Sequence, residues 1–143
     1  MFKIFLTRKE KIANKLYNSL FVKEYILENL KIEEHYIDAL IISNVGIFVF
    51  KILEYEENNI DKINEFKKEV GNHSDFVSSL TNYKYKVTPF VIGDKLNKNN
   101  KEVTSIEDFK DFVNNLKKII PNNEIESIRK TILSLNNKNE IDM

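Results

Sequence analysis

Cysteine is absent from the 143-residue chain. Its absence excludes disulfide bonds, zinc sites built on thiolates and a cysteine nucleophile. Apolar runs are short, and none approaches the roughly 18 residues that a membrane-spanning helix needs. Residues 1–6 are mostly apolar but too few for the core of a signal peptide, and no cleavage site follows them. We therefore expect a cytoplasmic protein without a membrane partner.

An excess of either charge is also lacking, because 22 Lys and Arg residues balance 22 Asp and Glu residues. A protein that grips nucleic acid through a basic field would carry a positive excess. Arg8 and Arg129 are the only arginines, and lysine is less suited to bidentate phosphate contacts. The charge balance favours a protein partner. A local basic patch that binds nucleic acid stays open as the alternative.

Residues 36–54 are the most apolar part of the chain, and they predict a β-hairpin. Its arms are rich in Ile, Val and Phe, and Gly46 supplies a positive φ for the turn. Because both faces of the arms are apolar, we expect the hairpin at the centre of a covered sheet. Two charges interrupt it. Strand alternation places Asp38 on the face of Leu40 and places Lys51 on the face of Val49.

Helix-start patterns and apolar periodicity predict the other elements. Thr7 with Glu10 is a capping box, and Ser105 begins a second pattern of this type. We expect helices over 8–20, 60–70 (ended by Gly71 and Asn72), 74–80 (begun by Ser74 or Asp75), 106–120 and 125–135, and further strands near 25–30 and 86–92. The order predicts an α/β fold with a small mixed central sheet flanked by helices. It forms one domain over residues 1–135, with a disordered tail over 136–143.

Three strand segments and one helix carry a family resemblance. They are Ile37-Asp38-Ala-Leu-Ile-Ile-Ser43, Gly46-Ile-Phe-Val49, Val87-Thr-Pro89-Phe-Val-Ile92, and the spacing of Glu10, Ala13, Tyr17 and Leu20. With them the chain resembles the nuclease-related domain (NERD) branch of the PD-(D/E)XK superfamily over roughly residues 10 to 120. The resemblance implies a restriction-endonuclease-like fold. In that family Asp and Glu hold Mg²⁺ or Mn²⁺, and a Lys stabilises the charged transition state.

The catalytic motif of that family is not kept. Its Glu falls on Lys51, its Lys falls on Leu53, and of its Asn-Pro-x-x-Gln stretch only Asn72 is retained. Lys51 replaces a metal ligand with a competing cation, and Leu53 removes the second function. The resemblance therefore implies a degenerate site, for which we expect no catalytic residues, no metal and no cofactor.

Within that site we expect Asp38 and Lys51 to form an internal ion pair, with the ammonium in the place of the lost metal. A hairpin loop of even length would direct both side chains to one face. Glu10 has two readings, a helix cap and a third site carboxylate, and we favour the cap. Glu54 has the wrong side-chain parity for a ligand unless a bulge intervenes. If the site were active, it would use Asp38, Lys51, Glu10 and Glu54.

The run from His73 to Asp75 invites a catalytic-triad reading. Three consecutive residues cannot bring their side chains into that register, so we predict a loop that ends in a helix cap. We interpret His35 as a strand-edge residue.

These observations predict a degenerate nuclease-fold domain that acts as a binding or regulatory module. A small bacterial or phage protein of this kind could inhibit a host nuclease or defence complex. The alternative is a divergent metal-dependent nuclease that cleaves DNA or RNA with Mg²⁺ or Mn²⁺.

Overall fold

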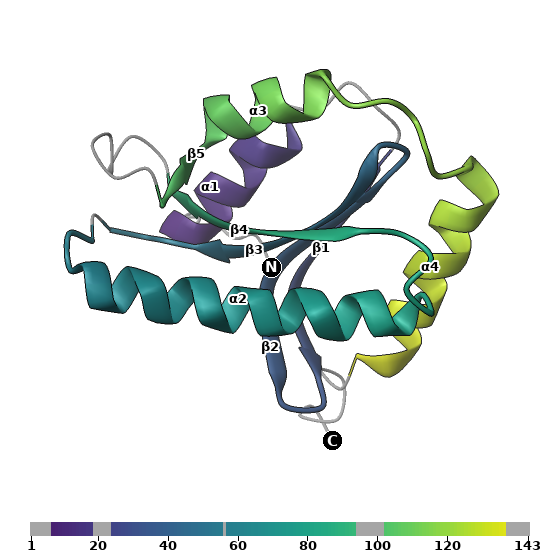
Figure 1. The fold of residues 1–143 in the computed structure, drawn as a ribbon, viewed down its shortest axis with the longest axis horizontal. Helices are drawn as coiled ribbons and strands as arrows, with labels where there is room; N and C mark the ends of the chain where they lie inside the picture. Colours follow the sequence, from purple (N-terminus) through teal and green to yellow (C-terminus); the bar gives the residue numbers. More distant parts are fainter. Residues whose placement is uncertain (1–6, 19–23, 56, 94–101, 137–143) are drawn as a thin grey trace, which may run out of the picture.

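The computed structural model describes residues 7–18, 24–55, 57–93 and 102–136 (Figure 1). Within these ranges the chain forms four helices and five strands. In order they are α1 (Arg8–Tyr17), β1 (Glu24–Ile32), β2 (His35–Ser43), β3 (Gly46–Ile52), α2 (Ile60–Leu80), β4 (Val87–Gly93), β5 (Thr104–Ser105), α3 (Ile106–Asn114) and α4 (Asn122–Leu135). The predicted α/β fold, a small mixed sheet flanked by helices, is confirmed.

The five strands form one sheet in the order β1-β2-β3-β4-β5. β2 runs antiparallel to both of its neighbours, β1 and β3. β4 runs parallel to β3, and β5 runs parallel to β4. A parallel neighbour requires a crossover connection, which α2 supplies between β3 and β4. The β2–β3 hairpin therefore lies at the centre of the sheet, as its two apolar faces predict.

Helices cover both faces of the sheet, and each face has its own apolar cluster. α2 and α4 lie against one face, here named the α2 face, and α1 and α3 lie against the other, the α1 face (Figure 1). The α2-face cluster includes Leu40, Ile42, Val49, Ile63, Val70 and Ile132; the α1-face cluster includes Ile12, Leu16, Ile41, Phe48, Phe50 and Phe109. Each such buried side chain contributes about 1.5–3 kcal/mol to stability.

The tip of the central hairpin is a two-residue turn between Ser43 and Gly46, which pair with each other. The Ser43 hydroxyl donates a hydrogen bond to the Gly46 carbonyl at 2.8 Å. Gly46 has a φ of 154°, and a Cβ there would lie 3.0 Å from the Phe48 ring, so the position requires glycine. The Asn44 amide donates to the Ile120 carbonyl at 2.9 Å, which ties the tip to the segment between α3 and α4.

The pairing of β1 with β2 is irregular at one position, here named the kink, where Asn29 and Asp38 lie across from each other. Asn29, in the middle of β1, has a left-handed φ of 51°, a conformation that Asn tolerates better than most residues. The β1–β2 ladder continues on both sides of Asn29, but the pairs found in it leave out Asn29 and Asp38, the residue across from it. Asp38 therefore lies where the regular alternation of side chains stops.

The kink changes which face the side chains of β2 take. Ala39 and Ile41 pack into the α1-face cluster and Leu40 packs into the α2-face cluster, as alternation requires. Ile37 also packs into the α2-face cluster, although alternation from Leu40 would put it on the other face. Asp38 itself accepts a hydrogen bond from Lys9 of α1, on the face opposite to Leu40, so the prediction that Asp38 shares the face of Leu40 is wrong.

α2 is one helix of 21 residues, where the sequence predicts two. The sequence predicts that Gly71 ends the first of these two helices, but Val70 and Val77 are buried on either side of it in one continuous helix. This burial outweighs the roughly 1 kcal/mol that glycine costs in a helix interior. Residues 73–75 consequently lie inside α2 rather than in a loop, and neither Ser74 nor Asp75 begins a helix.

Both predicted capping patterns begin helices. The Thr7 hydroxyl accepts a hydrogen bond from the Glu10 N–H, and the Glu10 carboxylate accepts one from the Thr7 N–H, which completes the capping box of α1. The Ser105 side chain accepts from the Asp108 N–H and caps α3. α3 ends at Asn114, earlier than predicted.

Two expectations concern residues outside the described ranges. The sequence predicts that Leu20 belongs to the helix over 8–20 and that residues 136–143 form a disordered tail. Leu20 and residues 137–143 lie outside the described ranges. Asn136, the first residue of that tail, is described, and its side chain accepts a hydrogen bond from the Lys31 N–H at 3.0 Å. In the described ranges, no helix has both the length and the apolar character needed to cross a membrane.

Candidate functional site

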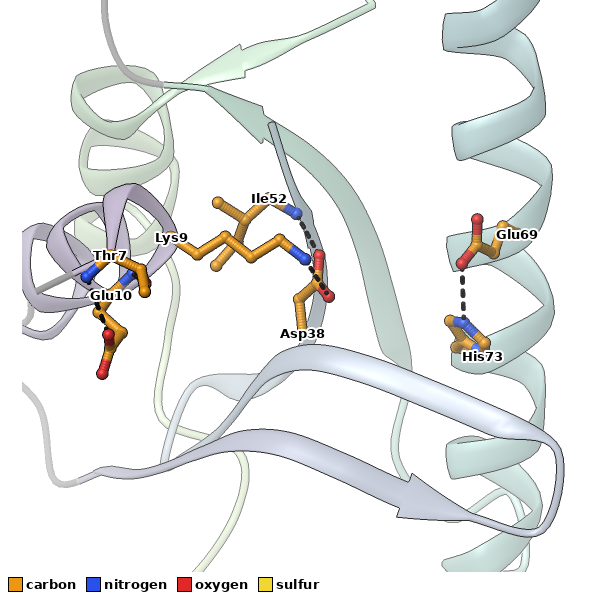
Figure 2. A network of polar contacts seen from close by, with 7 residues as sticks. All are labelled: Thr7, Lys9, Glu10, Asp38, Ile52, Glu69 and His73. Atoms are coloured by element: carbon orange, nitrogen blue, oxygen red, sulfur yellow. Dashed lines mark hydrogen bonds and ion pairs between the residues drawn. The ribbon is translucent and has the colours of Figure 1, made fainter. Parts of the chain in front are cut away.

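The Asp38 carboxylate lies at the open end of the central hairpin, where the β2–β3 ladder stops at the pair of Ala39 and Phe50. Its Oδ2 accepts a hydrogen bond from the Ile52 N–H at 2.9 Å, and its Oδ1 accepts one from Lys9 Nζ on α1 at 3.1 Å (Figure 2). The carboxylate thus replaces the main-chain carbonyl of β2 that would accept from the Ile52 N–H if the β2–β3 pairing continued. Both of its oxygens have a donor within the protein.

Lys51 lies on the other side of the sheet. Its Nζ is 5.1 Å from the centroid of the Phe66 ring on α2, in a cation–π contact. The side chain is half-buried, and its aliphatic stem can lie along apolar surface while the ammonium stays near solvent. Across the described part of the chain, no carboxylate forms an ion pair with Lys51.

The structure does not form the predicted Asp38–Lys51 ion pair, and Lys9 takes that place at Asp38. The hairpin turn has the even length on which the prediction depended. However, the kink at Asn29 directs Asp38 toward α1, and Lys51 stays on the α2 face. The two charges therefore have partners on opposite sides of the sheet.

The structure brings Lys9, rather than Glu10, to Asp38. The Glu10 carboxylate turns back to the Thr7 N–H, and Lys9 extends toward the hairpin (Figure 2). Glu54 is half-buried and follows the end of β3 by two residues. Leu53, where the resemblance would place a catalytic lysine, is buried in the α2-face cluster.

Lys9 is the site residue that sequence reasoning missed, although a signal for it was present. The buried residues of α1 are Ile12, Ala13 and Leu16. Lys9 precedes Ile12 by three positions and Ala13 by four, so it belongs to the same stripe of the helix. A lysine on the buried stripe of a helix predicts a buried or half-buried anionic partner.

A second polar cluster lies between β2 and α2. The Nδ1 atoms of His35 and His73 are 2.7 Å apart, and the His35 ring stacks on Phe76. His73 is 8% exposed, and its Nε2 has no hydrogen-bond partner in the described residues. The Glu69 carboxylate lies 3.7 Å from that Nε2, within electrostatic reach but too far for a hydrogen bond (Figure 2).

Burial lowers the pKa of His73, because the charged imidazolium loses hydration, and the nearby His35 ring lowers it further. The negative charges of Glu69 and Asp38 act in the opposite direction without reversing the shift. His73 is therefore held in its neutral form more strongly than an exposed histidine. The interpretation of His35 as a plain strand-edge residue missed this contact, since nothing local in the sequence relates residues 35 and 73.

The residues at Asp38 do not fit the divalent metal that the family resemblance implies. Such a site needs clustered carboxylate oxygens that are available to a hard cation. Here both Asp38 oxygens accept hydrogen bonds, and the Lys9 ammonium, a competing cation, lies 3.1 Å from Oδ1. In the described residues, no three His, Asp or Glu side chains gather in a group that could hold a metal ion.

A pocket of about 150 Å³ lies between the end of α2 and α4. Its polar lining includes Glu124, whose carboxylate accepts hydrogen bonds from Lys84 Nζ at 2.5 Å and from the Tyr85 hydroxyl at 2.7 Å. These two donors lower the pKa of Glu124. None of the residues predicted for the site lines this pocket.

No protein-family model matches the chain, and neither a curated protein nor a solved structure is significantly similar to it.

Proposed function

We propose that this chain is a nuclease-related scaffold that does not cleave phosphodiesters and acts as a binding or regulatory module. The observation that carries the proposal is the engagement of the Asp38 carboxylate by Lys9 and by the Ile52 N–H. With both oxygens hydrogen-bonded inside the protein, the Asp38 carboxylate stabilises the end of the β2–β3 strand pair. It is poorly placed to share a hydrated metal ion with substrate.

The alternative function, a divergent metal-dependent nuclease, would use Asp38 with Glu10 or Glu54. It requires Lys9 to leave Asp38, and the Glu10 version also requires the capping box of α1 to open. Each step loses an existing interaction before a metal can bind. This is why the non-cleaving module is the preferred proposal.

The two functions are separated by a cleavage assay on the full chain. Supercoiled DNA and single-stranded RNA are incubated with Mg²⁺ or Mn²⁺ and the wild type, Asp38→Ala or Asp111→Ala. Asp111 is an exposed aspartate on α3 and serves as the matched control. We expect no cleavage above the level of Asp38→Ala. Metal-dependent cleavage that persists in Asp111→Ala and disappears in Asp38→Ala would overturn the proposal.

For the partner, the balanced charge of the chain supports a protein over a nucleic acid. An inhibitor of a nuclease or defence complex would be one protein of this kind. Affinity purification from the native cell with mass spectrometry, with and without prior nuclease digestion of the lysate, tests the class of partner. A protein partner is expected to survive the digestion. Recovery that depends on intact nucleic acid would contradict this part of the proposal.

A further inference from the structure

The histidine pair, His35 and His73, joins the start of β2 to the middle of α2. The two Nδ1 atoms are 2.7 Å apart. The His35 ring also stacks on the Phe76 ring of α2, with centroids 4.3 Å apart, which gives His35 a second contact with that helix. The chain contains two histidines in total, and both belong to this contact. Any change in histidine protonation is therefore a change at this junction.

A short contact between two Nδ1 atoms requires that one of them donates a hydrogen and the other accepts it. The Glu69 carboxylate, 3.7 Å from His73 Nε2, favours a hydrogen on that nitrogen. His73 Nδ1 then carries the lone pair and accepts, and His35 Nδ1–H donates. The opposite arrangement would aim a lone pair at the carboxylate.

We propose that the histidine pair is a proton-sensitive latch, which holds the start of β2 against α2 at neutral pH and opens in mild acid. A proton added to His35 Nε2 leaves the latch closed, because His35 Nδ1–H still donates. A second proton, added to His73 Nδ1, replaces the acceptor lone pair with another N–H, and two cationic rings then face each other. The closed latch accommodates one added proton and not two.

The surroundings of His73 decide the direction of the pH effect. Burial and the His35 ring oppose its charge, and Glu69 on α2 and Asp38 on β2 favour it; the net result is a lowered pKa. In the unfolded chain both histidines titrate near about 6.5. The latch therefore contributes fully above that pH, and its contribution is lost as the pH falls toward the lower pKa of His73. For one proton, the unfolding equilibrium changes by up to about tenfold per pH unit.

The latch is tested directly by nuclear magnetic resonance of the ¹⁵N-labelled full chain, with the imidazole nitrogens followed from pH 7.5 to 5.0. At pH 7.5 we expect His73 with hydrogen on Nε2 and His35 with hydrogen on Nδ1. As the pH falls below about 6.5, His73 should stay neutral for as long as the latch is closed. In His35→Gln, the titration of His73 should move to a higher pH, since the opposing ring is gone. A His73 ring that titrates near about 6.5 in the folded wild type would overturn the proposal.

Hydrogen exchange shows whether protonation opens the junction. After correction for intrinsic rates, we expect exchange at residues 32–37 to rise about tenfold more than at residues 47–50 between pH 7.5 and 5.5. His73→Gln should abolish this difference, and if that variant fails to fold, His35→Gln should reduce it. Glu69→Gln should enlarge it, whereas Glu65→Gln, an exposed charge removal on the same helix, should not. A uniform rise along the chain would contradict the latch.

A bound metal is the competing explanation for two facing Nδ1 atoms, because both would then be acceptors. Stoichiometric binding of Zn²⁺ that shifts the Nδ1 resonances of both rings would overturn the proton-sharing latch. Unchanged spectra on addition of equimolar Zn²⁺ support it.

Discussion

Asp38 and Lys51 lie at the same end of one hairpin, yet their surroundings differ. Asp38 is bonded to a main-chain amide and to a lysine of α1, and its side chain is 15% exposed. Lys51 has an aromatic ring of α2 beneath its ammonium, and in the described part of the chain it has no carboxylate partner. The Asp38 carboxylate completes the hydrogen bonding of the sheet at Ile52. The Lys51 ammonium instead lies over an aromatic ring on the other face of the sheet.

The difference teaches that a charge inside an apolar hairpin need not pair with the opposite charge on the neighbouring strand. A residue from another element, here Lys9 of α1, can be its partner instead. Asp38 cannot be left without donors at the end of a buried strand pair, because an unbonded carboxylate there is costly. A lysine has a long stem and can place its ammonium beyond the sheet. We therefore expect substitutions of Asp38 to be more destabilising than substitutions of Lys51.

The largest effect is expected for Asp38→Ala. It leaves the Ile52 N–H without an acceptor and Lys9 without its partner, which together should lower the free energy of unfolding by about 2–3 kcal/mol. Asp38→Asn keeps an acceptor for Ile52 and should lose about half as much. Urea-induced unfolding at neutral pH measures both variants. A loss below about 0.5 kcal/mol in Asp38→Ala would show that these bonds contribute little.

A smaller effect is expected for Lys9→Met. The Lys9 side chain is 35% exposed, so solvent screens the ion pair and the loss should not exceed about 1 kcal/mol. Lys11→Met, at an exposed position of the same helix, is the matched control and should stay within about 0.5 kcal/mol of the wild type. Equal losses in the two variants would remove the special role of Lys9.

The smallest effect is expected for Lys51→Met. It removes one partly exposed cation–π contact and keeps the apolar stem, so the free energy of unfolding should change by less than about 0.5 kcal/mol. Thermal unfolding at two salt concentrations measures it, and the change should not depend on salt. A salt-dependent loss as large as that of Lys9→Met would show that Lys51 has an anionic partner after all.

The parts of the fold that the sequence predicts correctly depend on local signals. Thr7 with Glu10 and Ser105 with Asp108 begin helices because side chain and main chain bond within one turn. The central hairpin follows from its β-branched and aromatic arms and from Gly46. In each case the residues that decide the structure lie within a few positions of one another.

The parts that were missed depend on contacts between distant residues. Gly71 is a valid stop signal by itself, and burial of Val70 and Val77 against the sheet overrides it. Asn29 redirects Asp38 on the neighbouring strand, an effect that side-chain alternation within β2 could not reveal. For the site, the sequence identifies Asp38 and Lys51 as the unusual residues of the hairpin, but it assigns Asp38 the wrong partner because it does not reveal the kink.

The central claim is that Asp38 is a structural acceptor held by Lys9, and a pair of double-mutant cycles tests it most directly. One cycle combines Asp38→Asn with Lys9→Met and the other combines Asp38→Asn with Lys51→Met, all followed by urea-induced unfolding. We predict a coupling energy of about 0.5–1 kcal/mol between Asp38 and Lys9, and additivity within about 0.3 kcal/mol between Asp38 and Lys51. Coupling to Lys51 that equals or exceeds coupling to Lys9 would contradict the account.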